Sequence, residues 1–128
     1  MAVIKCMAWK FESGIPLSQQ IVEKLRRDVI SGEYPPGSLF PTVRQLAFSA
    51  SVNPNTMQKA LLLLEEEGLL VTLGTQGRIV TSDLDAIAQA KIRCTENEIG
   101  AMIRRARELG ITRDELIKYI RKGWRENE

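Results

Sequence analysis

The part of this sequence best suited to binding chemistry is a run of hydrogen-bonding side chains in which no acid occurs. Amides, hydroxyls and ammonium groups can donate to phosphate oxygens, and amides can also match the donor and acceptor pattern of a base edge. A run of this kind at the start of a helix indicates a surface that meets nucleic acid. Its members are Asn53, Asn55, Thr56, Gln58 and Lys59.

Three consecutive acids follow the polar run, at residues 65–67. A helix normally gains stability from acids at its N-terminus and bases at its C-terminus, and here the order is reversed. The reversal leaves the positive end of the helix dipole open to a phosphate. The alternative interpretation is that Asn53 is only a helix cap and that the acids form a solvated face.

Two further side chains precede this run. The guanidinium of Arg44 can bind a guanine edge with two hydrogen bonds or grip a phosphate, and the alternative is a surface arginine paired with a carboxylate. The hydroxyl of Thr42 can donate to a phosphate while it also caps a helix.

A short turn between two β-rich runs supplies a third group of candidates. Thr75, Gly77 and Arg78 lie at or beside its tip, where the residues are small enough to approach a nucleic-acid backbone closely. A minor-groove or phosphate contact is one interpretation of Arg78. The other is an ordinary hairpin turn with an exposed arginine.

The elements that position these candidates follow from apolar spacing in residues 1–82. Thr42 with Gln45 forms a capping box, and Asn53 before Pro54 is an N-cap followed by a favoured first helical residue. The order predicts a helix-turn-helix followed by a hairpin wing. The predicted helices run from Pro16 to Gly32, over 43–50 and over 54–67, and the predicted strands are 7–11, 69–73 and 78–81.

Residues 83–128 contain two more amphipathic segments, separated at Gly110, and Thr112 with Glu115 caps the second. Cys94 and Thr95 suggest a bend within the first. Two such helices cannot enclose a core alone, and a second copy of the chain is the simplest partner for their apolar stripe. We therefore expect a homodimer whose interface contains Leu84, Ile87, Ile92, Ile99, Met102, Ile103, Leu109, Leu116, Ile117, Ile120 and Trp124.

Composition excludes several classes of protein. Of the 128 residues, 44% are hydrophobic and 27% are charged, which is typical of a folded domain. The chain has no His, and Cys6 and Cys94 form no CxxC pair, which argues against His-based catalysis, zinc ribbons and disulfide scaffolds. The turn at 74–78 lacks the lysine of a phosphate-binding loop. We expect no enzyme activity, no metal and no cofactor.

The charge is nearly balanced, with a net value of +2. Residues 1–82 carry 8 basic and 7 acidic side chains, and residues 83–128 carry 10 and 9. Nucleic-acid binding must therefore depend on local placement of charge. No apolar run approaches the roughly 20 residues that span a bilayer, so we expect a soluble chain in a reducing cytoplasm, without membrane contact.

These stretches together resemble the GntR family of bacterial transcription regulators over about residues 15–81. The motifs that carry the likeness are PGSLFPTVRQLA at 36–47 and VNPNTM at 52–57. The resemblance implies that Arg44 and the polar start of the third helix, at Asn53, Asn55, Thr56 and Gln58, contact operator DNA. The chain departs from the family in having Thr42 where serine is usual, which keeps the hydroxyl, and in lacking a glycine–x–glycine wing tip.

The short tail is similar to that of the YtrA subfamily, through the stretch ELGITRDELI at 108–117. The resemblance implies a mainly α fold with a small β wing: a winged helix-turn-helix in residues 1–82, followed by a two-helix dimerisation tail in 83–128. It also implies a homodimeric repressor on palindromic double-stranded DNA, near transporter genes in many members. A winged-helix module that binds protein instead is the alternative, and a small-molecule effector stays open.

Overall fold

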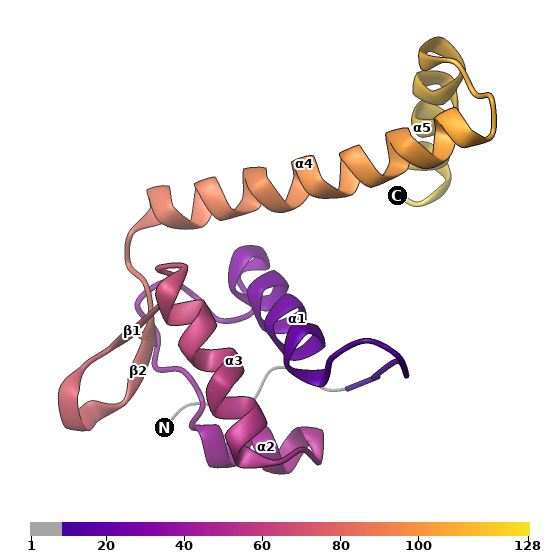
Figure 1. Ribbon diagram of the computed structural model, residues 1–128. Coiled ribbons are helices and arrows are strands. Elements are labelled where there is room, and N and C mark those ends of the chain that lie inside the picture. The colour runs from indigo at the N-terminus through magenta and orange to yellow at the C-terminus, as the bar shows by residue number, and fades with distance from the viewer. Residues whose placement is uncertain (1–8) are drawn as a thin grey trace. The chain divides into compact units, whose positions relative to one another are not determined.

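The computed structural model describes residues 9–128 of the chain (Figure 1). They divide into two compact units, one that ends at Lys91 and one that comprises Ile92–Glu128. The predicted mainly α fold with a small β wing is confirmed. The elements are α1 (Leu17–Ser31), α2 (Val43–Ala50), α3 (Pro54–Glu66), β1 (Leu70–Thr72), the 3-10 turn η1 (Gly74–Gln76), β2 (Arg78–Val80), α4 (Leu84–Glu108) and α5 (Arg113–Glu126).

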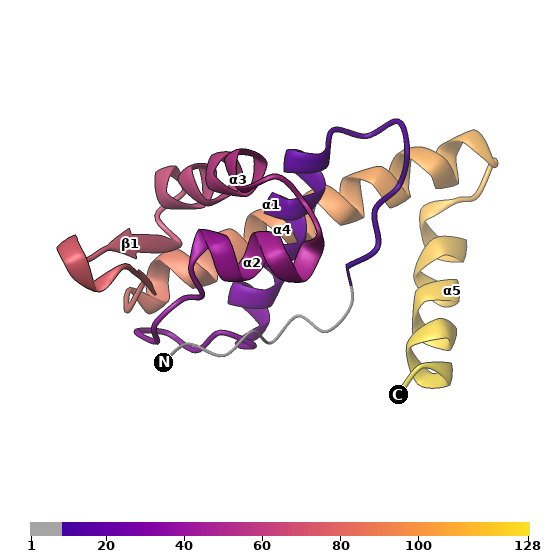
Figure 2. The same ribbon diagram turned by 90° about the horizontal axis from the view of Figure 1, so that it is seen from below.

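Figure 2 shows α2 and α3. Local capping determines where each of these helices begins. The backbone N–H of Gln45 donates to Thr42 Oγ1 at 3.1 Å, and the N–H of Thr42 donates to Gln45 Oε1 at 2.8 Å. The N–H of Asn55 donates to Asn53 Oδ1 at 2.8 Å, with Pro54 at the first helical position. Both predicted caps are confirmed, so local sequence alone places the start of each helix of the helix-turn-helix.

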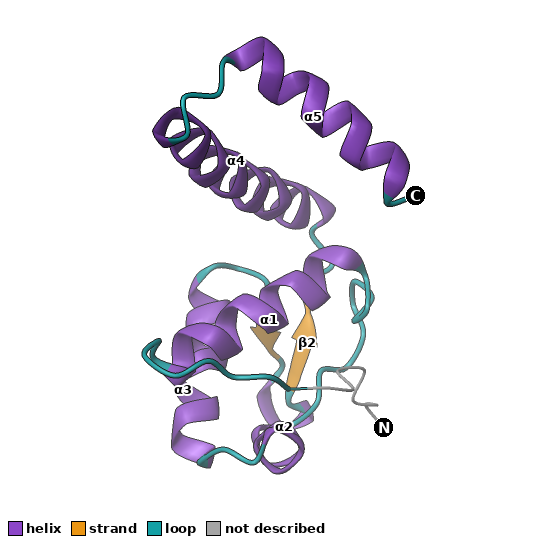
Figure 3. Cartoon of the chain, turned by 90° about the vertical axis from the view of Figure 1, so that its right-hand side faces the viewer, coloured by secondary structure: helices purple, strands orange, loops and turns teal. Residues whose placement is uncertain are grey.

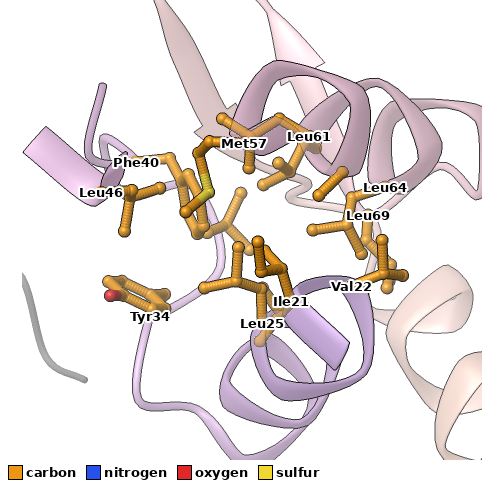
Figure 4. Packing of buried hydrophobic residues seen from close by; sticks show 14 of the residues in the cluster. Ile21, Val22, Leu25, Tyr34, Phe40, Leu46, Met57, Leu61, Leu64 and Leu69 are labelled. Atoms are coloured by element: carbon orange, nitrogen blue, oxygen red, sulfur yellow. The ribbon is translucent and has the colours of Figure 1, made fainter. Parts of the chain in front are cut away.

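The core of the first unit lies where α1, α2 and α3 meet (Figure 4). α3 packs against α1, α2 and β1. The largest contributions come from fully buried side chains, which remove apolar surface from water and hold the helices together. They include Ile21 and Leu25 of α1, Leu46 of α2, and Met57, Leu61 and Leu64 of α3.

The wing is an antiparallel hairpin in which Thr72 of β1 pairs with Arg78 of β2 (strands in orange in Figure 3). The other edge of β2 is hydrogen bonded to the segment before α2. The N–H of Phe40 donates to the carbonyl of Arg78, and the N–H of Gly37 to that of Val80, both at 2.9 Å. The sequence predicted only a turn there. These bonds tie the wing directly to the start of the helix-turn-helix.

The predicted strand at 7–11 is wrong for residues 9–11, which belong to no strand; residues 7 and 8 lie outside the described part. Side-chain packing holds this segment instead. Trp9 stacks on Phe11 with ring centroids 5.7 Å apart, and its indole N–H donates to Ser49 Oγ at 3.1 Å. A strand exists only where its backbone pairs with a neighbour, and β2 already uses its free edge for residues 37–40.

α4 is a single helix that continues through Cys94 and Thr95 without interruption. Their low helix propensity amounts to a few tenths of a kcal/mol each, too little to interrupt the backbone hydrogen bonds on either side. Ala90 is buried in the core of the first unit, and Ile87 packs against it. The first two turns of α4 therefore complete that core, and the compact unit extends beyond residue 82.

The second unit consists of the rest of α4 and α5. Its predicted cap is confirmed: the N–H of Glu115 donates to Thr112 Oγ1 at 3.2 Å, and Glu115 Oε1 accepts from the N–H of Thr112 at 3.1 Å. Ala106 is the one buried hydrophobic residue of this unit. None of the helices in residues 9–128 is long and apolar enough to cross a membrane.

Stability of the first unit should depend on α3. We expect Leu61→Ala to lower the free energy of unfolding by about 2–5 kcal/mol, because it removes buried methyl groups and leaves a cavity. The neighbouring Leu62 is 44% exposed, so Leu62→Ala should cost less than about 1 kcal/mol. Urea titration followed by circular dichroism measures both, and equal losses would contradict this packing.

Candidate nucleic-acid interface

The start of α3 presents the predicted polar run to solvent. Asn53, Asn55 and Lys59 are exposed, and Thr56 and Gln58 are half-buried. Met57 and Ala60, which alternate with them, are fully buried. The helical repeat therefore turns apolar side chains into the core and hydrogen-bonding side chains outward.

Arg44 is exposed on the first turn of α2 and lies beside the start of α3. It lines a hollow together with Phe48, Val52 and Pro54. Phe48 is 89% exposed, an unusual position for an aromatic ring. Sequence reasoning missed Phe48, although its place outside the apolar stripe of α2 was a visible signal.

A second hollow, of about 560 Å³, lies between the wing and the start of α2. Thr42, Arg44, Gly77 and Arg78 all line it, so the fold brings together candidates from two separate stretches of sequence. Thr75 is exposed at the wing tip and does not line this hollow. The φ angle of Gly77 is +92°, a conformation that favours glycine at the tip.

Arg78 is engaged within the protein. Its Nε–H donates to Glu65 Oε1, and a terminal N–H donates to Gln58 Oε1 at 3.4 Å. Thr72 Oγ1 donates to the same oxygen of Glu65 at 2.6 Å. The Arg78 side chain is only 17% exposed, and its guanidinium joins the wing to α3.

The acids at the end of α3 have structural partners. Arg26 of α1 makes two hydrogen bonds to the carboxylate of Glu67, at 2.8 and 2.9 Å. Glu65 is likewise paired, with Arg78. The interpretation of residues 65–67 as only a solvated face is therefore wrong for Glu65 and Glu67. Sequence reasoning missed both pairs, since each partner lies on another element.

The pKa of the Glu65 carboxyl is held below its usual value. The hydrogen bond from Thr72 lowers this pKa most, burial raises it, and the hydrogen bond and positive charge of Arg78 lower it further. Glu65 therefore stays ionised over the range in which proteins are normally handled.

The predicted dimer residues fall into two groups. Ile87, Met102, Ile103 and Leu116 are half-buried, and Ile87 packs against the core of its own first unit. The others are exposed large hydrophobic side chains. They are Leu84, Ile92, Ile99, Leu109, Ile117, Ile120 and Trp124.

The described residues offer few side chains that could hold a metal ion or a cofactor. Within residues 9–128, no cluster of three or more Cys, Asp or Glu side chains is arranged to hold a metal ion. Cys94 is a half-buried free thiol, and Cys6 lies outside the described residues.

A three-helix core, a hairpin wing and a third helix with an exposed polar face define the winged helix-turn-helix class of DNA-binding proteins. The sequence profile of the bacterial regulatory proteins of the gntR family matches residues 17–80. The chain belongs to the GntR family. It is therefore a DNA-binding transcription regulator and not an enzyme.

Similar proteins extend the match beyond the winged helix. The chain is 28% identical to the HTH-type transcriptional regulator YhcF of Bacillus subtilis (strain 168), over 88% of this chain and 93% of that protein. It is also 28% identical to the HTH-type transcriptional repressor YtrA of the same organism, over 86% and 85%. A solved GntR family transcriptional regulator from Listeria monocytogenes has a TM-score of 0.83 and 29% identity, over 88% of this chain and 98% of that one. The resemblance to the YtrA subfamily is confirmed.

The Glu65 carboxylate should contribute stability that depends on pH. Because its pKa is lowered on folding, this contribution is present above the unfolded value of 4.5 and is lost as the pH falls through the folded pKa. We expect Glu65→Gln to be less stable than the parent at pH 7, with a difference that shrinks below pH 4.5.

Urea titrations from pH 7 to pH 3 measure this difference. Glu66→Gln, an exposed acid on the same helix, is the matched control and should give a smaller difference at pH 7. A Glu65→Gln difference that stays constant across the range would contradict the proposed contribution.

Proposed function

We propose that this protein is a homodimeric repressor that binds an inverted-repeat DNA operator. The observation that carries the proposal is the exposed, acid-free polar start of α3 beside Arg44. In winged-helix proteins the N-terminal residues of this helix lie nearest the base edges of the major groove. The relative YtrA of Bacillus subtilis is a transcriptional repressor, which supports the direction of regulation.

Side chains of different chemical type would make different contacts with the operator. Asn55, Gln58 and Lys59 project from the first two turns of α3, where they reach base edges. Arg44 reads a base or grips the backbone from α2. The donor hydrogen of the Thr42 hydroxyl is available to a phosphate, because its oxygen accepts from the N–H of Gln45.

A second copy of this chain is the occupant that best fits the apolar side chains of the second unit. Because Ala106 is the one buried hydrophobic residue of this unit, a single copy gains little stability from the burial of apolar surface. Two identical copies would cover each other's stripes around a twofold axis. They would present two α3 helices to major-groove faces about 34 Å apart, or a multiple of that distance.

Selection of bound sequences from random duplex DNA tests the whole proposal. We expect an inverted repeat whose half-sites are separated by about 10 base pairs or a multiple of it. Repression is then tested with a reporter gene placed behind the selected site. Bound sequences without any repeat, or a reporter that the protein activates, would contradict the proposal.

Arg44→Ala should weaken operator binding by about 1–3 kcal/mol and relax specificity at one base pair, if Arg44 reads a base. Fluorescence anisotropy with the operator and its single-base variants measures both effects. Arg27→Ala removes the same charge from an exposed position on α1 and should change affinity little. Uniform weakening across all sequences would instead assign Arg44 to a phosphate.

A charge in the apolar stripe should separate the two copies. We expect Ile103→Glu and Ile120→Glu to shift the protein from dimer to monomer in analytical ultracentrifugation, since burying a carboxylate without a partner is costly. Operator affinity should fall with the loss of the second half-site contact. Asn97→Asp adds the same charge at an exposed position of α4 and should stay dimeric; dimeric Glu variants would refute the assigned interface.

A further inference from the structure

Phe48 of α2 keeps nearly all of its aromatic ring in water. Its exposed fraction is 89%, the highest among the large hydrophobic residues of the described part of the chain, whereas Tyr34 and Phe40 are each 2% exposed. The hydrophobic core of the first unit does not include Phe48. Water around an apolar ring costs free energy that contact with another apolar group recovers. The ring is therefore available to a molecule outside its own unit.

The position of Phe48 on α2 places the ring next to residues proposed to meet DNA. Phe48 follows Arg44 by four residues, so the two side chains lie on one face of the helix, with Cβ atoms about 5–6 Å apart. Both line the hollow that also contains Pro54, the first residue of α3. The exposed ring is thus continuous with the surface formed by Arg44 and the start of α3.

The charge around the ring favours DNA as the molecule that covers it. No Asp or Glu occurs between Glu33 and Glu65, and Arg44 and Lys59 are the only charged residues in that stretch. None of the residues that line the hollow beside Phe48 is acidic. A polyanion can approach this apolar ring without meeting a like charge on the same surface.

The location on α2 indicates which part of the duplex the ring meets. In a helix-turn-helix the first helix crosses the DNA backbone, whereas the second helix enters the major groove. Phe48 lies on the first of these helices. The C–H groups of deoxyribose are the apolar part of the backbone. Each sugar is bonded to a base and to phosphates, so a ring one helical turn from Arg44 meets a sugar whether Arg44 binds a base or a phosphate.

We propose that Phe48 packs on the deoxyribose of an operator nucleotide beside the contact of Arg44, once in each half-site. The contact adds affinity and fixes α2 on the backbone without reading sequence, because every nucleotide carries the same sugar. This inference rests on the proposed operator binding and adds an apolar contact to the hydrogen-bonding residues already named.

Hydroxyl-radical footprinting measures this contact directly, because the radical cleaves DNA by abstracting hydrogen atoms from deoxyribose. The full chain is bound at saturation to the operator that the parent protein selects. Phe48→Ala should expose one or two sugars in each half-site that the parent protects, while the rest of the footprint is unchanged. Phe48→Leu keeps an apolar side chain and should retain partial protection. Ile15→Ala shortens an exposed apolar side chain before α1, and this matched control should give the parent footprint.

Affinity measurements separate a sugar contact from a base or phosphate contact. Phe48→Ala should weaken binding of the dimer about tenfold, roughly threefold for each half-site, as expected when part of one ring returns to water. The loss should be the same for the operator and for its single-base variants. The slope of log affinity against log salt concentration should keep the parent value, because no charge is removed.

The 5-methyl group of thymine is the other apolar group of DNA that an aromatic ring can contact, in the major groove. Replacing each operator thymine in turn by uracil removes this methyl group. The parent and Phe48→Ala should respond equally to every replacement, so that their tenfold difference persists. A single replacement that abolishes the difference would assign the ring to thymine and overturn the sugar contact.

Thermal unfolding should find each variant folded at the binding temperature, since Phe48 lies outside the core. An unchanged footprint and affinity in folded Phe48→Ala would overturn this inference alone and assign the ring to a protein partner. A parent protein that selects no sequence from random DNA would overturn the proposed operator binding and this inference with it.

Discussion

Burial of one face of α3 is the constraint on which the rest of this structure depends. Met57, Leu61 and Leu64 are fully buried against the other helices (Figure 4), and burial of each such side chain is worth roughly 1.5–3 kcal/mol. A helix rotates by a set angle per residue, so fixing one face fixes the other. Asn55 and Lys59 are exposed to solvent because the apolar side chains on the opposite face of α3 are buried.

Ion pairs then connect α3 to the elements on either side. Glu65 binds Arg78 in the wing, and Glu67 binds Arg26 in α1. All four side chains are partly exposed, so each pair contributes about 1 kcal/mol or less to stability. Their larger effect is on the distribution of charge: two acids at the end of α3 are neutralised by arginines of the same chain, while Arg44 stays exposed beside the start of α3. A protein with a net charge of only +2 can in this way attract a polyanion locally.

Local signals were sufficient for most of the fold. The caps at Thr42, Asn53 and Thr112 depend on atoms within three residues, and each forms as the sequence indicates. Local signals failed where pairing partners are distant. Residues 9–11 have β-forming side chains but no strand to pair with, and the turn before α2 becomes a partner of β2 through bonds across about forty residues.

The sequence by itself determined the chemical types of the candidate interface and their outward direction, because helical periodicity and capping are short-range properties. Only the tertiary structure decided which of those groups are already engaged. Arg78 meets Glu65 at a separation of 13 residues and Gln58 at 20. No sequence periodicity predicts these contacts. They form only after the hairpin packs on α3 and brings one guanidinium within reach of both side chains.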